Sequence, residues 1–190
     1  MSYKNNLVEI LISFFLYWVF FSLIGFIPSL KSGPITYFVF MPAGIKLFSV
    51  LIFRWRGALG TGLAIFTRLM LTNNPENWGN WLLVAVSVSV VLYLVVELGL
   101  RTFKTNDDLD SLTYLQIVTL ATVASIVNGL VYAYTFNGLS IGQIGDGALH
   151  TGFLTIMGNF AGNAVFVCSA IFLLRHQEAI RAIFSRLKSQ

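Results

Sequence analysis

Two basic side chains stand inside long apolar stretches of this chain. Lys46 lies two helical turns before Arg54, and Arg68 lies near the end of the next apolar run. An ionisable side chain at mid-depth in a bilayer costs roughly 2.5–3.5 kcal/mol or more, so each requires a partner or a function. Lys46 either pairs with an acid on a neighbouring segment, Glu97 or Glu9, or faces an anionic ligand. Arg68 either extends to the outer headgroups or binds an anionic group that enters from outside.

The most regular polar pattern lies in the last apolar run. Gly158 and Gly162 are four residues apart, and so are Asn159 and Asn163, so each pair forms a stripe along one helix face. Small residues at this spacing let helices approach closely, and asparagines form hydrogen bonds across such contacts. Close helix packing is therefore one interpretation. The alternative is a ligand pocket lined by Asn159 and Asn163 together with Asn128.

A proline step interrupts the apolar run that contains Lys46. Pro42 is followed by an alanine and a glycine, and proline breaks or bends a helix because it lacks the N–H donor and its ring clashes with the preceding turn. Broken helices at membrane depth line cavities rather than face lipid. The step predicts a ligand cavity near Pro42, Lys46, Asn159 and Asn163, with a purely structural kink as the alternative.

Residue patterns for catalysis are absent from the sequence. The two histidines, the single cysteine and the eight acids form no cluster at metal-ligand spacing, and no phosphate-binding loop occurs. We therefore expect neither an enzyme nor a bound metal or cofactor. Cys168 lies in an apolar run, which favours a buried, unreactive thiol. The net charge of +4 does not indicate nucleic-acid binding, because the few basic residues stand at helix ends, where anionic lipid headgroups account for them.

The composition indicates an integral membrane protein. Hydrophobic residues make up 56% of the 190 positions and charged residues 11%, whereas soluble domains contain about 25% charged residues. We predict an all-α fold, a single domain formed by a bundle of six transmembrane helices. The spans expected from the apolar runs are 7–27, 35–53, 57–71, 78–100, 112–136 and 148–174. The segment 175–190 is expected to form a short cytoplasmic amphipathic helix.

The basic residues of the links predict the orientation. Nine lysines and arginines lie in the N-terminus, in the links after the second and fourth spans, and in the C-terminal segment, against Lys31 alone in the other links. Positive residues stay on the cytoplasmic side, so both termini are expected in the cytoplasm of a cell with a bacterial-type inner membrane. Among the six predicted spans, the short, glycine-rich third span is the one for which a full crossing of the membrane is least well supported.

Two sequence features resemble the membrane-associated sensor (MASE-type) domains, which are multi-helix input domains of bacterial histidine kinases and diguanylate cyclases. The first is MPAGIK at 41–46, followed by an apolar helix and by RWRGALG at 54–60; the second is GNFAGN at 158–163. Asn159 stands where the family has an acidic residue. No kinase or cyclase domain follows within these 190 residues, so the resemblance implies a stand-alone input module that signals to a separate protein.

Three functions remain open. The first is a sensor-like or accessory subunit that binds a small ligand, a protein partner, or both through its helix bundle. The second is the substrate-binding membrane subunit of a small-molecule importer, although the bulky, aromatic first span lacks the small-residue stripe expected for docking. The third is a structural subunit of a larger membrane complex. All three imply the lipid bilayer as the surrounding medium and no contact with nucleic acid.

Overall fold

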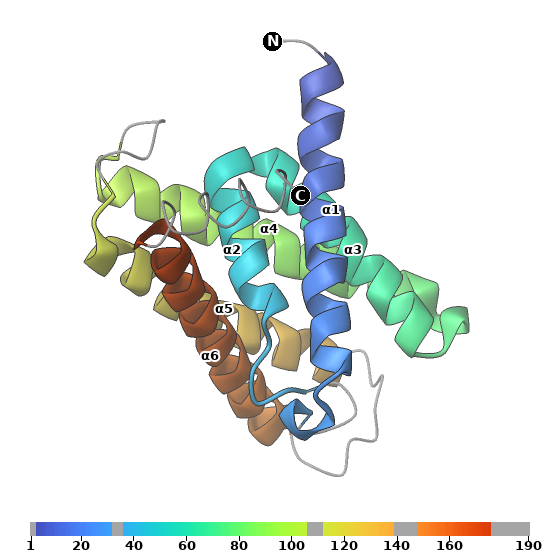
Figure 1. Ribbon diagram of the computed structural model, residues 1–190. Helices are drawn as coiled ribbons and strands as arrows, with labels where there is room; N and C mark the ends of the chain where they lie inside the picture. The colour runs from blue at the N-terminus through green and yellow to red at the C-terminus, as the bar shows by residue number, and fades with distance from the viewer. Residues whose placement is uncertain (1–2, 32–35, 106–111, 139–147, 176–190) are drawn as a thin grey trace, which may run out of the picture.

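The computed structural model describes residues 3–31, 36–105, 112–138 and 148–175, and these ranges form an all-α fold. One isolated β-bridge within them joins Lys31 to Tyr37. The short 3₁₀ helices η1 and η2 cover Pro28–Leu30 and Pro75–Asn77. Six α-helices follow one another in the described chain (Figure 1): α1 (Tyr3–Gly25), α2 (Pro42–Phe53), α3 (Trp55–Thr72), α4 (Trp78–Thr102), α5 (Tyr114–Gly138) and α6 (Ala148–Arg175).

Four of these helices are long and apolar enough to cross a membrane. The apolar segments run over Asn6–Gly25, Pro75–Thr102, Tyr114–Thr135 and Gly152–Ser169. They belong to α1, α4, α5 and α6 and make this a multi-pass membrane protein. The 18 residues of α3 contain two arginines, and the 12 residues of α2 extend only about 18 Å. A hydrocarbon core is about 30 Å thick, so α2 by itself covers little more than half of it.

The second helix is shorter than the predicted segment 35–53. Pro42 is the first residue of α2, so the proline step breaks the predicted segment instead of bending it. Proline suits the first helical position, because its fixed φ angle matches the helix and the N–H that it lacks would have no partner there. The described residues before it, 36–41, are not helical. The Phe40 amide instead donates a hydrogen bond to the Gly158 carbonyl of α6 over 2.8 Å.

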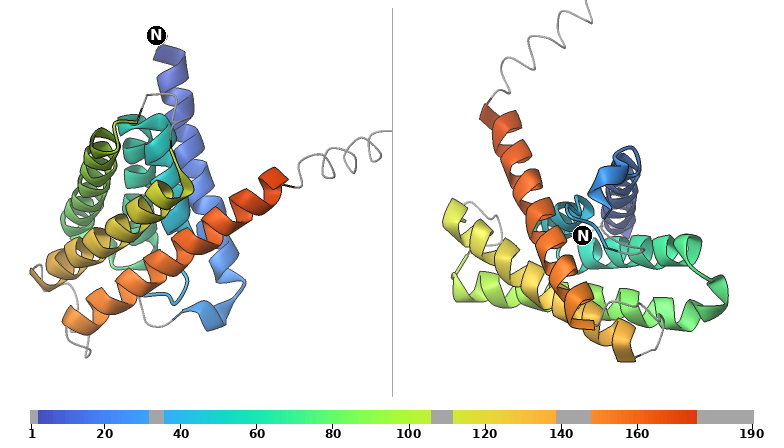
Figure 2. Two further views of the ribbon diagram at one scale, coloured as in Figure 1. Left: turned by 90° about the vertical axis from the view of Figure 1, so that its left-hand side faces the viewer. Right: turned by 90° about the horizontal axis from the view of Figure 1, so that it is seen from below.

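Helix α2 lies in the interior of the bundle. It contacts all five other helices, and the views in Figures 1 and 2 place it behind α6 and beside α1. Nine of its 12 residues are buried. Two hydrophobic clusters flank it: one contains Tyr17, Leu69 and Trp81, and the other contains Leu47, Val96 and Leu120. The shortest helix of the bundle is thus the one that the others surround.

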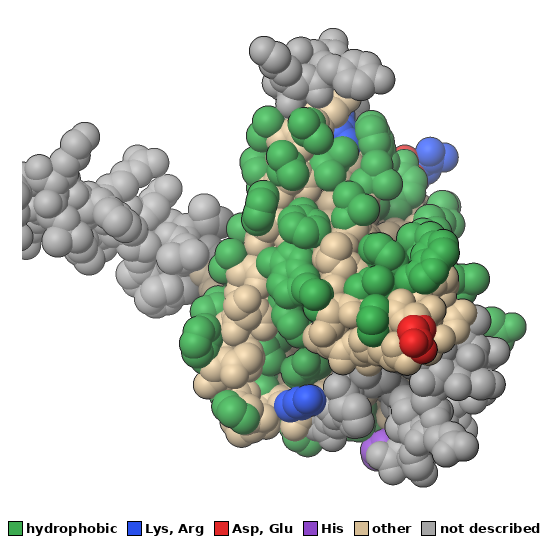
Figure 3. Space-filling model, turned by 90° about the vertical axis from the view of Figure 1, so that its right-hand side faces the viewer, with side chains coloured by type: hydrophobic (Ala, Val, Ile, Leu, Met, Phe, Trp, Pro, Cys, Tyr) green, Lys and Arg blue, Asp and Glu red, His purple; other side chains and the backbone are tan. Residues whose placement is uncertain are grey.

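Apolar side chains cover most of the outer surface. Phe15, Leu63, Leu98 and Tyr134 are each about half or more exposed, and Figure 3 shows one such face, on which few charged side chains are visible. Cys168 is also exposed, which corrects the expectation of a buried thiol. An apolar helix face in a membrane protein can contact lipid as well as protein, so apolar neighbours in the sequence do not place a residue in the interior.

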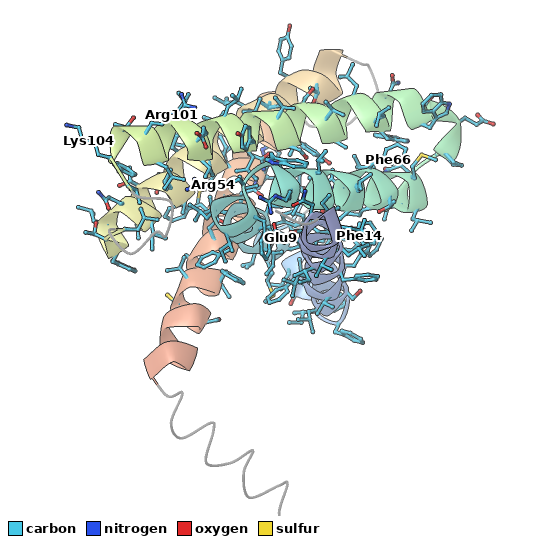
Figure 4. The ribbon with its side chains drawn as sticks, turned by 90° about the horizontal axis from the view of Figure 1, so that it is seen from above. Glu9, Phe14, Arg54, Phe66, Arg101 and Lys104 are labelled. Carbon is cyan, nitrogen blue, oxygen red and sulfur yellow. The ribbon has the colours of Figure 1, made fainter. Side chains whose placement is uncertain are left out.

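Ion pairs join charged residues of α1, α3 and α4 and Arg54, which lies between α2 and α3. Arg56 of α3 donates to Glu9 of α1 over 2.6 Å. Glu97 of α4 pairs with Arg101 over 3.1 Å, as the four-residue spacing predicts, and with Arg54 over 4.0 Å. Figure 4 labels Glu9, Arg54 and Arg101 among these residues. Through Glu97, Arg54 of the predicted link after the second span lies close to Arg101 of the predicted link after the fourth. The amphipathic helix predicted for 175–190 lies outside the described residues beyond Arg175.

Candidate functional site

A small polar cavity lies inside the bundle, between α2 and the helices that surround it. A water-sized sphere can be centred in about 30 Å³ of it, which is room for roughly two water molecules or one small ion. Every α-helix and the segment before α2 contribute to its wall. The lining residues include four of the six predicted ligand-binding residues, Lys46, Arg68, Asn128 and Asn159, and also Tyr17, Thr36, Tyr37, Phe40, Ile65, Val88, Tyr132, Thr155 and Gly158.

Arg68 points into the bundle and does not extend to the headgroups. Its side chain stands four residues before the end of α3, and the residue is 6% exposed. The Nη2 group donates to the Tyr132 hydroxyl over 3.2 Å. The guanidinium carbon lies 5.4 Å from the ring centroids of Phe21 and Phe40, a distance at which the electron-rich ring face attracts a cation. The alternative that Arg68 snorkels outward is therefore wrong.

Lys46 lies one turn into α2 and is 4% exposed. Its Nζ atom is 5.5 Å from the centroid of the same Phe40 ring that Arg68 contacts. The two acids proposed as its partners are engaged elsewhere, Glu9 with Arg56 and Glu97 with Arg54 and Arg101. Neither acid lines the cavity, so pairing of Lys46 with Glu9 or Glu97 is wrong.

The cavity therefore holds two cationic side chains and no acid from the described part of the chain. Glu9, Glu76 and Glu97 are the acids in that part, and none of them is among the lining residues. The N-terminus of α2 also lies at this site, because Phe40 and Lys46, on either side of its first turn, both line the cavity. A helix N-terminus carries a partial positive charge, which adds to the two full charges.

Uncharged polar groups complete the wall. The Oδ1 atom of Asn128 and the Nδ2 atom of Asn159 are buried without a hydrogen-bond partner, and the two residues are 7% and 2% exposed. A buried polar group without a partner costs about 1–3 kcal/mol. A bound group can therefore accept a hydrogen bond from Asn159 Nδ2 or donate one to Asn128 Oδ1. Tyr17 and Thr155 line the same cavity.

Asn163 and Pro42 shape the site without lining this cavity. Asn163 donates to the Ser125 hydroxyl over 2.9 Å and to the Ala121 carbonyl over 3.3 Å, so it joins α6 to α5. Asn163 also lines a smaller adjoining cavity of about 10 Å³, together with Lys46, Asn128 and Asn159. Pro42 is buried and begins the helix that carries Lys46.

The two glycines of the α6 stripe pack closely, but against the non-helical backbone before α2 instead of another helix. A Cβ atom added to Gly158 would collide with the Tyr37 carbonyl, and one added to Gly162 would collide with the Phe40 carbonyl. The absence of side chains at these two positions lets the segment before α2 lie directly on α6. This contact places Tyr37 and Phe40 beside the cavity.

Sequence reasoning did not identify the aromatic part of the site. Tyr17, Tyr37, Phe40 and Tyr132 stand in apolar runs rich in aromatic residues. Their types and spacing do not separate them from ordinary core or lipid-facing residues, and Tyr132 is linked to Arg68 only by folding.

Comparisons with protein-family models, with curated proteins and with solved structures found no match for this chain.

Proposed function

We propose that this chain is an integral membrane protein that binds a small anionic group in the cavity around Lys46 and Arg68, and that it acts as a sensor-like or accessory subunit. The observation that carries this proposal is the pair of buried cations that share one cavity and one aromatic ring without an acid from the described residues. A ligand with a negative charge is the simplest group that completes such a site.

The energetic reason is the cost of two uncompensated charges. Removing a single ion from water costs several kcal/mol even after the protein relaxes. The two like charges lie within 5.5 Å of one Phe40 centroid, so they are at most about 11 Å apart and also repel each other by at least about 1.5 kcal/mol at an effective dielectric constant of 20. A bound anion offsets both costs, because it attracts Lys46 and Arg68 at the same time. The two buried charges that destabilise the protein without an anion therefore favour the binding of one.

The short second helix supports the same conclusion. In membrane proteins with discontinuous helices, the N-terminus of the half-helix points at the anionic group of the ligand. Helix α2 has this form, since it begins at Pro42 beside the cavity and has only 12 residues. Non-helical backbone at membrane depth is tolerated where protein or a cavity surrounds it, as the segment before α2 is by α6.

The sensor part of the proposal rests on the resemblance to membrane-associated sensor domains and on the position of α2. This helix joins the cavity at Lys46 to the charged cluster at Arg54, two turns or about 12 Å away. A bound anion that shifts α2 would act on the pair of Arg54 with Glu97 and, through the adjoining start of α3, on the pair of Arg56 with Glu9. We place this cluster on the cytoplasmic side of a bacterial inner membrane, with six spans and both termini inside, where a partner protein could read the change.

A second candidate function is the membrane subunit of a small-molecule uptake system. The discontinuous helix favours it, because transporters use such helices to bind substrate near the middle of the bilayer. Isolation of the protein in mild detergent, followed by mass spectrometry of what accompanies it, separates the candidates. A kinase or cyclase would support the sensor, an ATPase would support uptake, and a large assembly would indicate a structural subunit.

The anion site is tested by the thermal unfolding of the purified protein in detergent. Sodium acetate is added at constant ionic strength in exchange for the sodium salt of a bulky morpholinesulfonate, which is too large for a cavity of about 30 Å³. A ligand present at 100 times its Kd stabilises the protein by about 2.7 kcal/mol. We expect unfolding to shift to higher temperature with acetate. No shift at any concentration of small anions would contradict the proposal.

A further inference from the structure

We infer that the cavity selects a planar oxoanion, the class that includes carboxylates, nitrate and bicarbonate, over spherical halides and tetrahedral oxoanions. This inference rests on the proposed anion site and specifies what the site takes. Three observations support it: the hydrogen-bond donors that the Arg68 guanidinium has left for a ligand, the volume of the cavity, and the position of Lys46.

The surroundings of Arg68 leave in-plane donors for a ligand. Phe21 and Phe40 stabilise the charge of the guanidinium through their ring faces, which attract a cation without offering it a lone pair. Tyr132 accepts one hydrogen bond from Nη2, and Nε is buried with no hydrogen-bond partner. Nε and Nη2 lie on the same edge of the planar group. Two parallel N–H donors on one edge match the two oxygens of a planar oxoanion.

Tyr132 holds this edge in place. Its hydroxyl accepts from Nη2 over 3.2 Å from the neighbouring helix α5, and Tyr132 itself is 7% exposed. A long, flexible arginine loses less freedom on binding when its guanidinium is already oriented. The tyrosine is thus a positioning residue, because it acts on the ligand through Arg68.

The volume of the cavity excludes larger anions. Space for the centre of a water-sized sphere amounts to about 30 Å³, and one water requires roughly 10–15 Å³ on this scale. A carboxylate or nitrate group fills such a space. Sulfate and phosphate add oxygens out of the plane and bring a second charge with stronger hydration. A halide fits, but a sphere cannot engage two parallel donors along one edge as an oxoanion does.

Lys46 supplies the second half of the recognition. Its ammonium is a compact charge with three rotatable donors, and it lies at the same Phe40 ring as Arg68 but comes from α2. Lys46 therefore attracts any small anion without regard to shape. Arg68 distinguishes anions by their shape. Substitution of one residue at a time therefore separates the general attraction by Lys46 from the selectivity of Arg68.

The test compares the affinities of one set of anions for the wild-type protein and for Arg68→Lys. Purified protein in detergent is titrated with formate, acetate and nitrate, with chloride and bromide, and with sulfate and phosphate, and Kd is taken from calorimetry or from the unfolding temperature. We expect formate and nitrate to bind at least about tenfold more tightly than chloride or sulfate, a difference of about 1.4 kcal/mol. Arg68→Lys keeps the positive charge but loses the two parallel N–H donors of the guanidinium. The preference for formate and nitrate over chloride and sulfate should therefore fall below about threefold, which is less than half of that difference of about 1.4 kcal/mol.

Two further variants keep the outcome interpretable. Arg101→Lys makes the same change at an exposed arginine and should leave the preference intact. Tyr132→Phe removes the hydroxyl that positions the guanidinium, and it should weaken the preference for planar anions even if Arg68→Lys fails to fold. Equal binding of formate, chloride and sulfate to the wild-type protein would overturn this inference and leave the anion site standing. Absence of binding by every anion would contradict the proposed function itself.

Discussion

Replacement of Lys46 by methionine is the most direct test of the site. Methionine is also long and unbranched, so it fills similar space without the charge. In the absence of a small anion, the wild-type protein holds two uncompensated cations, Lys46 and Arg68, in one cavity. The substitution removes one desolvated charge and its repulsion from the other. Removal of one partner of a buried ion pair destabilises a protein by about 3–5 kcal/mol, so an increase in stability here would show that Lys46 is not held by an acid.

The magnitude follows from the geometry. Lys46 and Arg68 lie 5.5 Å and 5.4 Å from the centroid of one Phe40 ring, so the two charges are at most about 11 Å apart. They therefore repel each other by at least about 1.5 kcal/mol at an effective dielectric constant of 20. Apolar replacement of buried ions stabilises proteins by about 1–4 kcal/mol in favourable cases. We expect Lys46→Met to unfold at a temperature about 4–8 °C higher, since 1 kcal/mol shifts Tm by about 2–4 °C for a chain of this size.

The anion dependence gives the second readout. Acetate should stabilise the wild-type protein and leave Lys46→Met nearly unchanged, so that the two unfolding curves approach each other as acetate is added. Unfolding is followed by tryptophan fluorescence in detergent. Lys31→Met is the matched control, because Lys31 is exposed on the described surface and such changes alter stability by less than about 0.5 kcal/mol. A destabilised Lys46→Met that still responds to acetate as the wild-type protein does would refute the reasoning.

Three further predictions concern the framework of the site, each measured as the free energy or temperature of unfolding. Gly162→Ala should destabilise the protein by about 1–3 kcal/mol, since its Cβ would collide with the backbone before α2, whereas Gly79→Ala meets nothing within 4 Å and should not. Lys104→Gly should stabilise by about 1 kcal/mol, because the positive φ of 52° disfavours a side chain; a loss would contradict this. Glu9→Gln should cost about 1 kcal/mol by weakening the bond to Arg56, and an unchanged unfolding temperature would show that the pair is not stabilising.

The local sequence was sufficient to predict the helices and several residues of the site. The apolar runs predict the helical segments, because their composition and length dominate what a chain does in a bilayer. The cost of a charge in hydrocarbon identified Lys46 and Arg68. The four-residue spacing of Asn159 and Asn163 identified Asn159 and led to Asn128 as a third amide of the same pocket. Four of the residues proposed for a ligand do line one cavity. The pairing of Glu97 with Arg101 was equally local, since one helix face brings them together.

Only the tertiary structure decided which of the alternatives for these residues holds. The acids Glu9 and Glu97 bind arginines, so Lys46 faces Arg68 across a cavity instead of an acid. The sequence contains more lysines and arginines than acids. The spacing of residues along the chain does not predict which acid pairs with which base on another helix. Packing also decided where α2 begins, because Gly158 and Gly162 leave room for the non-helical segment before Pro42 to lie against α6. Charge and hydropathy are properties of single residues and short runs, whereas the partner of a buried charge depends on which helices lie next to it.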